Sequence, residues 1–266
     1  MTTRREILGL LAAFGAASRP LAAEQSFTLD HFKLRVADLD RSVAFYFRLF
    51  GGPLAEIRGG SVPSPPDLRA VFFKIGSGKP YMILSPPDPK VPVGLEHVAV
   101  DAAAMTVVKE HRLPLAFPPD SYVRDPDGNL LEFVGPGYWS YPNVVRQAPH
   151  LPDNLTGRQP IFEPLAIQRV ALRVSDRRRA AGFYSLFGIP DARNRSFDFR
   201  GTALDLVPSR QAQGLAAFTV VVRNFDVASA RQSLRELGIT PERIQRGLIR
   251  LRDPDGNLVE VVAPSQ

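Results

Sequence analysis

The chain contains no cysteine among its 266 residues. Disulfide bonds, thiolate metal ligands and a cysteine nucleophile are therefore all excluded. Any metal ion that the protein holds must be bound by histidine, aspartate or glutamate, and such ligands favour hard or borderline metals. At this length the chain suits two domains of a little over a hundred residues, each large enough to bury a core.

The N-terminal segment lacks a hydrophobic run long enough to span a membrane. Its apolar stretch, Ile7 to Ala17, is shorter than the ~20 residues that a spanning helix needs. Arg4 and Arg5 precede this stretch and Pro20 to Ala23 follow it as a cleavage region, so residues 1–23 are predicted to be an export signal. The paired arginines resemble a twin-arginine signal, which predicts a periplasmic protein; an ordinary secretory signal is the alternative. We expect no stable membrane insertion.

The chain also lacks a strong surplus of charge. Its formal net charge is +6, and removal of residues 1–23, which hold three arginines and one glutamate, leaves +4. Basic residues are interspersed with acidic ones, as in Asp38 to Arg41. The densest basic run, Arg177 to Arg179, is interpreted as the solvated start of a helix. We therefore expect no nucleic acid partner.

What the chain does contain is an internal repeat. The stretch Tyr122 to Glu132 returns as Arg250 to Glu260, with the same Asp-Pro-Asp-Gly-Asn turn leading into a strand that carries a glutamate. The copies differ in their chemically reactive side chains, because His31 and His97 of the first copy correspond to Arg169 and Ala217 in the second. The sequence thus predicts that only the first copy is equipped for chemistry.

Alternation of apolar and polar residues predicts that the first copy opens with a strand, Leu29 to Val36. A helix should follow, capped by Asp38 or Asp40 and ended by Gly51-Gly52. The second copy repeats this order. The other predicted elements are strands at 70–75, 81–84, 94–100, 130–134, 216–222 and 258–262, and helices at 103–111 and 227–237.

These patterns predict two domains, at residues 27–136 and 165–264, joined by a linker at 137–164. The stretch from Gly135 to Pro164 contains Trp139 and several prolines and glycines, but it has no period of its own. We expect a partly ordered strap there rather than a further domain.

The combination of motifs resembles the vicinal oxygen chelate superfamily, which includes glyoxalase I, extradiol dioxygenases, methylmalonyl-CoA epimerases and metal-free bleomycin-resistance proteins. The motifs are Asp30-His31 in the first strand, Phe45-Tyr46 in the helix, Glu96-His97 in a later strand, and the turn Asp125 to Asn129 leading to Glu132. The resemblance implies an α+β fold of two tandem domains, each made of paired βαβββ modules that form a cupped mixed sheet.

The resemblance assigns metal-ligand roles to His31, His97 and Glu132. Two imidazoles and one carboxylate leave coordination positions open, and non-haem Fe(II) oxygenases use this set. One Fe(II) or Mn(II) ion is expected, with Ni(II) or Zn(II) as alternatives, and a substrate with two neighbouring oxygen atoms would chelate it. A histidine on a strand is more often a packed or surface residue, and Glu132 could instead be a solvent-facing partner of Arg124.

Within the superfamily, the ligand set is similar to that of extradiol dioxygenases. Their signature has a tyrosine ten residues before the glutamate, which Tyr122 matches and which implies a hydrogen bond to a substrate oxygen; a half-buried strand aromatic is the alternative. The further histidine of that signature has no counterpart at the usual spacing, and His111 is expected to act as an acid or base only if its loop folds inward. Glyoxalase I and the epimerases use a fourth ligand, which Tyr81 to Leu84 does not offer.

The sequence therefore predicts an exported metal-dependent enzyme that acts on a small oxygen-rich or aromatic molecule, with dioxygenase-like chemistry as the leading subtype. A glyoxalase-type lyase or isomerase is one alternative. Another is a metal-free module that binds a hydrophobic ligand, in which Trp139, Phe117 and Tyr122 line a pocket and His31 and His97 do not converge. A monomer is expected, since two copies in one chain supply the paired-domain arrangement.

Overall fold

The computed structural model describes residues 26–52, 54–58, 69–117, 121–135 and 159–264. The predicted signal and Trp139 lie outside these residues. Within them, no helix combines the length and the apolar character that crossing a membrane requires.

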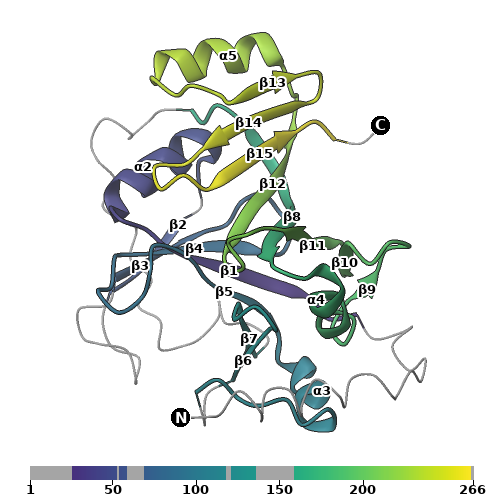
Figure 1. Ribbon diagram of the computed structural model, residues 1–266. Coiled ribbons are helices and arrows are strands. Elements are labelled where there is room, and N and C mark those ends of the chain that lie inside the picture. The colour runs from purple at the N-terminus through teal and green to yellow at the C-terminus, as the bar shows by residue number, and fades with distance from the viewer. Residues whose placement is uncertain (1–25, 53, 59–68, 118–120, 136–158, 265–266) are drawn as a thin grey trace.

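The first copy forms one seven-stranded sheet, in the order β2-β3-β4-β1-β5-β7-β6 (Figure 1). The sheet is mixed: β1 runs parallel to β4 and antiparallel to β5, and β5 runs parallel to β7. Its strands are β1 (Leu29–Arg35), β2 (Leu54–Arg58), β3 (Arg69–Phe73), β4 (Tyr81–Ser85), β5 (Gly94–Asp101), β6 (Tyr122–Arg124) and β7 (Leu130–Val134).

The second copy forms an eight-stranded sheet with the corresponding order, β13-β14-β15-β12-β8-β11-β10-β9. Two mixed sheets with helices confirm the predicted α+β class. The strands are β8 (Glu163–Val174), β9 (Ile189–Pro190), β10 (Ser196–Phe199), β11 (Thr202–Pro208), β12 (Leu215–Arg223), β13 (Arg243–Gln245), β14 (Leu248–Arg252) and β15 (Leu258–Val262).

In the described residues four helices accompany the sheets, namely α2 (Leu39–Phe50), α3 (Met105–Glu110), α4 (Arg177–Tyr184) and α5 (Val227–Glu236), and the short 3₁₀ helix η1 (Ala102–Ala104) precedes α3. The first helix begins and ends as the sequence predicts. The Asp38 side chain accepts a hydrogen bond from the backbone N–H of Arg41, and Gly51 ends the helix with a φ of 69°.

Two details differ from the expected modules. In the described residues, the second half of the first copy has β6 and β7 but only an isolated bridge, Leu115 to Val123, where a third strand would lie. In addition, β8 begins at Glu163, inside the stretch expected to lack regular structure. The first residues of β8 pair with the end of β12, at Val222 and Arg223, so pairing with a distant strand extends β8 where the local sequence shows no period.

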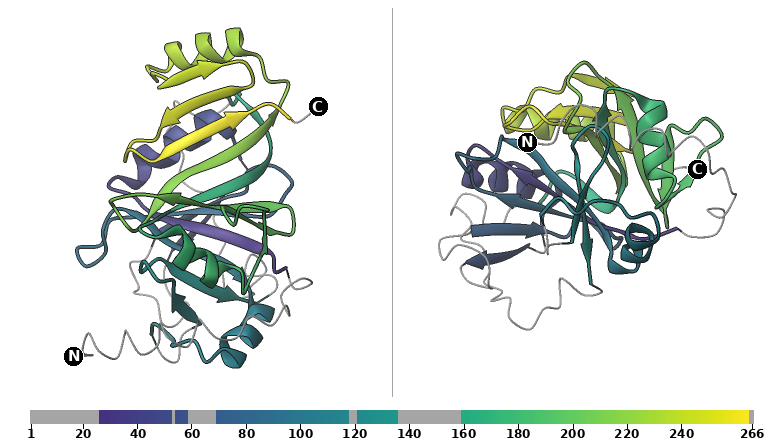
Figure 2. Two further views of the ribbon diagram at one scale, coloured as in Figure 1. Left: turned by 45° about the vertical axis from the view of Figure 1, so that its right-hand side comes forward. Right: turned by 60° about the horizontal axis from the view of Figure 1, so that its bottom comes forward.

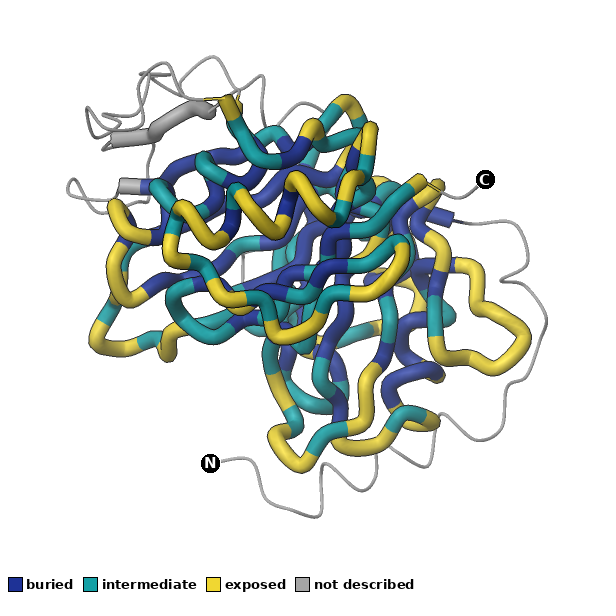
Figure 3. The backbone as a smooth tube through the Cα atoms, turned by 90° about the horizontal axis from the view of Figure 1, so that it is seen from above, coloured by how far each residue is buried: buried dark blue, intermediate teal, exposed yellow. Residues whose placement is uncertain are grey.

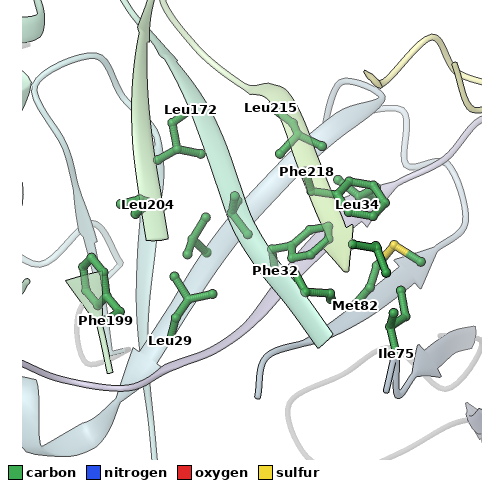
Figure 4. Close-up of a cluster of buried hydrophobic side chains, with 14 of the residues drawn as sticks. Leu29, Phe32, Leu34, Ile75, Met82, Leu172, Phe199, Leu204, Leu215 and Phe218 are labelled. Carbon is green, nitrogen blue, oxygen red and sulfur yellow. The ribbon is translucent and has the colours of Figure 1, made fainter. Parts of the chain in front are cut away.

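The two sheets share one hydrophobic core. Figure 4 shows side chains of the first copy, such as Phe32 and Leu34, interleaved with side chains of the second, such as Leu215 and Phe218. The rings of Phe32 and Phe218 lie 5.1 Å apart between centroids. Burial is concentrated in the strands, and the exposed residues lie mainly in turns and on the outer sides of helices (Figure 3). The copies therefore do not have separate cores, although the sequence shows them as two repeats.

The Asp-Pro-Asp-Gly-Asn turns connect the copies reciprocally. The Tyr184 hydroxyl on α4 donates to Asp125 Oδ2 at 3.0 Å, and the Tyr46 hydroxyl on α2 donates to Asp253 Oδ2 at 2.7 Å. Each copy's turn is thus bound by the first helix of the other copy. Helix α2 accordingly lies beside β15 of the second sheet (Figures 1 and 2).

All four groups are buried, and burial shifts the pKa of Asp125, Tyr46 and Tyr184. Loss of solvation raises the pKa of Asp125 even though Asn129 and Tyr184 donate hydrogen bonds to its carboxylate. Burial, reinforced by the neighbouring aspartate, raises the pKa of Tyr46 and of Tyr184 well above the ordinary value. Both hydroxyls are therefore neutral donors at any physiological pH.

Candidate metal centre

Three neighbouring strands carry the predicted ligands on one face of the first sheet. His31 lies on β1, His97 on β5 and Glu132 on β7, and these strands are adjacent in the order β1-β5-β7. Their neighbours in sequence, such as Phe32 and Val98, point into the shared core because side chains alternate along a strand. We call the face that carries His31, His97 and Glu132 the site face.

The three ligand atoms form a compact triangle. His31 Nε2 lies 3.1 Å from His97 Nε2 and 3.3 Å from Glu132 Oε2, and His97 Nε2 lies 3.0 Å from Glu132 Oε2. These are the three residues that, within the described part of the chain, come close enough together to hold an ion. Both histidines are nearly fully buried, at 1% and 4% exposure, so they are neither surface residues nor isolated.

The triangle fits a divalent metal. Ligand bonds of about 2.1 Å that meet at right angles separate neighbouring ligand atoms by about 3.0 Å. The three observed separations are close to this value, so one ion can contact all three ligands from one side. The donor set, two nitrogen atoms and one oxygen atom without sulfur, suits Fe(II), Mn(II), Ni(II) or Zn(II).

Each histidine is preceded by an acidic residue that sits in a β-bulge. In the β1–β5 ladder the pairing shifts at Asp30 and again at Glu96, which are the extra residues of their strands. The bulges turn both carboxylates towards the histidines, because a bulge reorients the extra side chain. Asp30 Oδ1 lies 2.8 Å from His31 Nδ1, and Glu96 Oε1 lies 3.8 Å from His97 Nδ1.

The Asp30 contact orients Nε2 of His31 towards the triangle. When Nδ1 bonds a carboxylate, Nε2 is left to face the site, as in many histidine metal sites. Glu96 is bound more tightly by two cations of β1. Lys33 Nζ lies 2.8 Å from Glu96 Oε1, and Arg35 Nη2 forms an ion pair with Glu96 Oε2. Burial would raise the pKa of Glu96, but the two cations and the nearby His97 outweigh it and lower that pKa.

The protonation of the cluster follows from burial and mutual contact. Burial disfavours the charged form of both imidazoles, but the carboxylates of Asp30 and Glu132 outweigh it at His31 and raise its pKa. At His97 burial prevails over the attraction of Glu132, and its pKa is lowered. Burial would raise the pKa of Glu132, yet the two imidazoles bring it far below its usual range. Glu132 is therefore ionised, which is the state that binding of a metal ion would require.

Two tyrosines border the cluster. The Tyr122 hydroxyl on β6 donates to Glu132 Oε1 at 2.7 Å, which leaves Oε2 for the histidines. The Tyr81 ring on β4 stacks on the His31 imidazole with centroids 5.0 Å apart. Glu132 therefore contacts Tyr122 and the histidines rather than Arg124, whose guanidinium bonds the Gly128 carbonyl instead.

The structure does not bring His111 to this cluster. His111 is the exposed C-terminal cap of α3, and the buried residues of that helix, Val107 and Val108, pack into the shared core behind the sheet. The site face is on the other side of the sheet. The proposed inward fold of the His111 loop is thus not observed, and the helix geometry explains why.

The second copy has no comparable cluster in its described residues, and its strand registers show which residue replaces each ligand. His97 pairs with Lys33 and Leu130, and Ala217 pairs with Ala171 and Leu258 at the same points of the second sheet. By the same registers Arg169 stands in place of His31, and Arg250 in place of Tyr122.

The retained glutamate of the second copy is neutralised by protein groups. Arg250 donates to Glu260 Oε1 at 2.8 Å, and the Thr219 hydroxyl donates to Oε2 at 3.0 Å. Arg169 pairs with Asp205. A guanidinium thus supplies the positive charge beside Glu260, and the arrangement leaves no room for a three-ligand metal site.

Sequence reasoning predicts the three residues that converge in the triangle, and Tyr122 beside them, but misses the residues around them. In the sequence Asp30 and Glu96 stand out only as neighbours of the histidines, and Lys33 and Arg35 only as polar positions of a strand. A signal is present, because residues i+2 and i+4 from His31 must share its face when the strand is regular. The bulges that add the two acids to this face are not encoded by any simple spacing.

Comparison with known proteins agrees with this arrangement. The family model of the Glyoxalase/Bleomycin resistance protein/Dioxygenase superfamily matches residues 28–133. Comparison with curated protein sequences gives no significant match.

Similar folds occur among solved structures. The 2,3-dioxygenase LapB from Pseudomonas sp. KL28 is 15% identical, with a TM-score of 0.58 over 92% of this chain and 94% of that one. Homoprotocatechuate 2,3-dioxygenase from Brevibacterium fuscum is 14% identical, with a TM-score of 0.59 over 93% and 83%. The Mn(II)-bound glyoxalase from Novosphingobium aromaticivorans is 16% identical, with a TM-score of 0.54 over 90% and 82%.

At these identities the likeness to solved structures is one of fold. The family match falls on the copy that carries His31, His97 and Glu132, and the second copy repeats its sheet order. The first copy therefore belongs to the glyoxalase, bleomycin resistance protein and dioxygenase superfamily, and the second copy repeats its fold in tandem.

Proposed function

We propose that the first copy is a metal-dependent enzyme acting on a small molecule that has two neighbouring oxygen atoms, with dioxygenase-like chemistry as the reaction class. The triangle formed by His31, His97 and Glu132 is the observation that carries this proposal. Three ligands on one side leave the opposite positions of an ion open, which is the arrangement of the 2-His-1-carboxylate oxygenases.

Fe(II) or Mn(II) is the ion that we favour, with Ni(II) or Zn(II) as alternatives; when bound, it would supply Lewis-acid or redox chemistry. The protein groups have distinct tasks. Asp30 keeps His31 Nε2 directed at the site, and Tyr122 holds Glu132 through the oxygen that faces away from the histidines. Tyr122 also borders the site, where its hydroxyl would orient a substrate oxygen.

Two alternatives have less support. The metal-free binding module requires that His31 and His97 do not converge, whereas their Nε2 atoms lie 3.1 Å apart. A glyoxalase-type lyase needs a fourth ligand from the strand next to β1, and Tyr81 stands beside His31 there with its ring stacked on the imidazole. A three-ligand oxygenase-like site fits these residues better.

Export through a twin-arginine-like signal at residues 1–23 and a monomeric state are further parts of this proposal. Export is supported by Arg4, Arg5 and the apolar stretch after them. Fractionation of cells that produce the full chain tests it, because retention in the cytoplasm would contradict the export signal. Light scattering of the purified protein tests the monomer.

Metal content tests the enzyme proposal most directly. Protein purified without chelators or a polyhistidine tag should contain about one equivalent of Fe, Mn, Ni or Zn, whereas a His31→Ala, His97→Ala double variant should contain almost none. His111→Ala is the matched control, because it removes an exposed histidine and should keep the metal. Protein loaded with Fe(II) or Mn(II) should then take up O₂ with small catechols.

Wild-type protein that binds no metal after reconstitution with each of the four ions would refute the site. Binding of Fe(II) or Mn(II) without O₂ uptake for any small catechol would refute the dioxygenase assignment and favour the lyase.

A further inference from the structure

A charged group on the site face is not explained by metal binding. Lys33 lies two residues after His31 on β1, with its side chain on the same face because side chains alternate along a strand, and it pairs across the ladder with His97. Two residues of strand place Lys33 about 7 Å from His31 along β1. This distance is within reach of a small molecule that is bound at the triangle.

The ion pairs that hold Lys33 are uneven in charge. Glu96 contacts both Lys33 and Arg35, so two cations share one carboxylate. Arg35 also donates to the Pro86 carbonyl, and its side chain is only 9% exposed, which makes it the fixed partner of Glu96. Lys33 is the surplus cation, and its side chain, at 16% exposure, is the more accessible of the two.

The second copy provides an internal comparison. It keeps both β-bulges and keeps an arginine, Arg173, at the position of Arg35. The positions of Lys33 and Glu96 are instead occupied by Ala171 and Ala216. The arginine and the bulges therefore belong to the fold of either copy, whereas the Lys33–Glu96 pair occurs only beside the metal ligands.

A surplus cation with little access to water constrains what can cover it. An apolar group would remove the remaining water from the ammonium group without replacing its hydrogen bonds, and a neutral oxygen atom would replace them without balancing the charge. An anionic group would replace those hydrogen bonds with charge-assisted ones. We propose that Lys33, positioned by Glu96 in the bulge of β5, is an anion subsite of the metal centre, so that the substrate carries a carboxylate besides its two chelating oxygen atoms.

This inference rests on the proposed function, and matched ligands can test it separately. Protein loaded with Zn(II), which does not change oxidation state, is titrated calorimetrically with 3,4-dihydroxyphenylacetate and with the methyl ester of the same acid. Wild type should bind the acid about 10- to 100-fold more tightly than the ester, the range of one charge-assisted hydrogen bond. Lys33→Met should lose this preference while it keeps its zinc and its affinity for the ester.

Two further variants separate a subsite from a structural role. Lys33→Arg should restore most of the preference, and Lys90→Met, which removes an exposed lysine and changes the net charge equally, should leave it unchanged. If Lys33→Met binds zinc and still prefers the acid as wild type does, the subsite is refuted and the metal centre stands. The subsite is equally refuted if Lys33→Met weakens zinc binding alone. If wild type binds neither zinc nor either ligand, the proposed function fails, and this inference fails with it.

Discussion

Removal of the Tyr184 hydroxyl tests how strongly the two copies depend on each other. In a Tyr184→Phe variant the ring still fills its place in the core, but Asp125 Oδ2 loses the hydroxyl at 3.0 Å and keeps the Asn129 side-chain amide at 2.8 Å. Asp125 is 4% exposed, so water cannot readily replace the lost donor. A hydrogen bond to a charged group is worth about 1.5–3 kcal/mol, and we expect the free energy of unfolding to fall by that amount.

Urea denaturation followed by circular dichroism measures this change, and a melting curve should show a Tm lower by about 3–12 °C for a chain of this size. Tyr46→Phe is the matched variant, because it removes the corresponding hydroxyl from Asp253 and should cost a similar amount. Thr106→Val removes an exposed hydroxyl and should change stability by less than about 0.5 kcal/mol.

Because the core is shared, each variant should unfold in one transition. A loss below about 0.5 kcal/mol in both tyrosine variants, or separate transitions for the two copies, would refute the reciprocal connection.

Three further outcomes are expected. Asp30→Asn should weaken metal affinity about 10- to 100-fold by releasing the orientation of His31, measured by competitive zinc titration, and an unchanged affinity would contradict the orienting role. Metal affinity should also fall as the pH is lowered through the raised pKa of His31, because a proton then competes with the ion; titrations between pH 6 and 8 that show no such trend would argue against His31 as a ligand. Arg250→Met should lower stability by about 1 kcal/mol, since Glu260 loses its charged partner at a partly exposed position and keeps only the Thr219 hydroxyl; a gain in stability in urea denaturation would count against charge compensation there.

The ligand triangle could be predicted because regular strands constrain which side chains share a face. His31, His97 and Glu132 fall on strands that the sequence shows by alternation, and the duplicated turn singles out Glu132 by its place in the repeat. The helix boundaries at Asp38 and Gly51 could also be predicted, because a helix cap depends on the side chain and backbone freedom of the capping residue itself.

The remaining features depend on contacts between distant parts of the chain. The buried role of Asp125 was not predictable, because its partner Tyr184 lies 59 residues away in the other copy. Likewise, the bulges at Asp30 and Glu96 arise from a register shift between two strands rather than from either strand alone. His111 was misleading because residue type and proximity in sequence suggested a role, whereas the packing of α3 behind the sheet directs it away.

The reciprocal binding of the turns has a consequence for how substitutions accumulate in the chain. The second copy cannot be lost, because its side chains complete the core that it shares with the first copy, even though its described residues hold no counterpart of the His31, His97 and Glu132 triangle. Substitutions on the outward face of the second sheet, where Arg169 and Ala217 lie, do not alter the contacts that the second copy makes with the first. Substitutions at Tyr184 or Phe218 would remove such contacts, namely those with Asp125 and Phe32. The sequence of the second copy can thus vary on the outward side of its sheet but is constrained on the core side. The second copy therefore resembles the partner subunit of an obligate dimer that is covalently joined to the first copy.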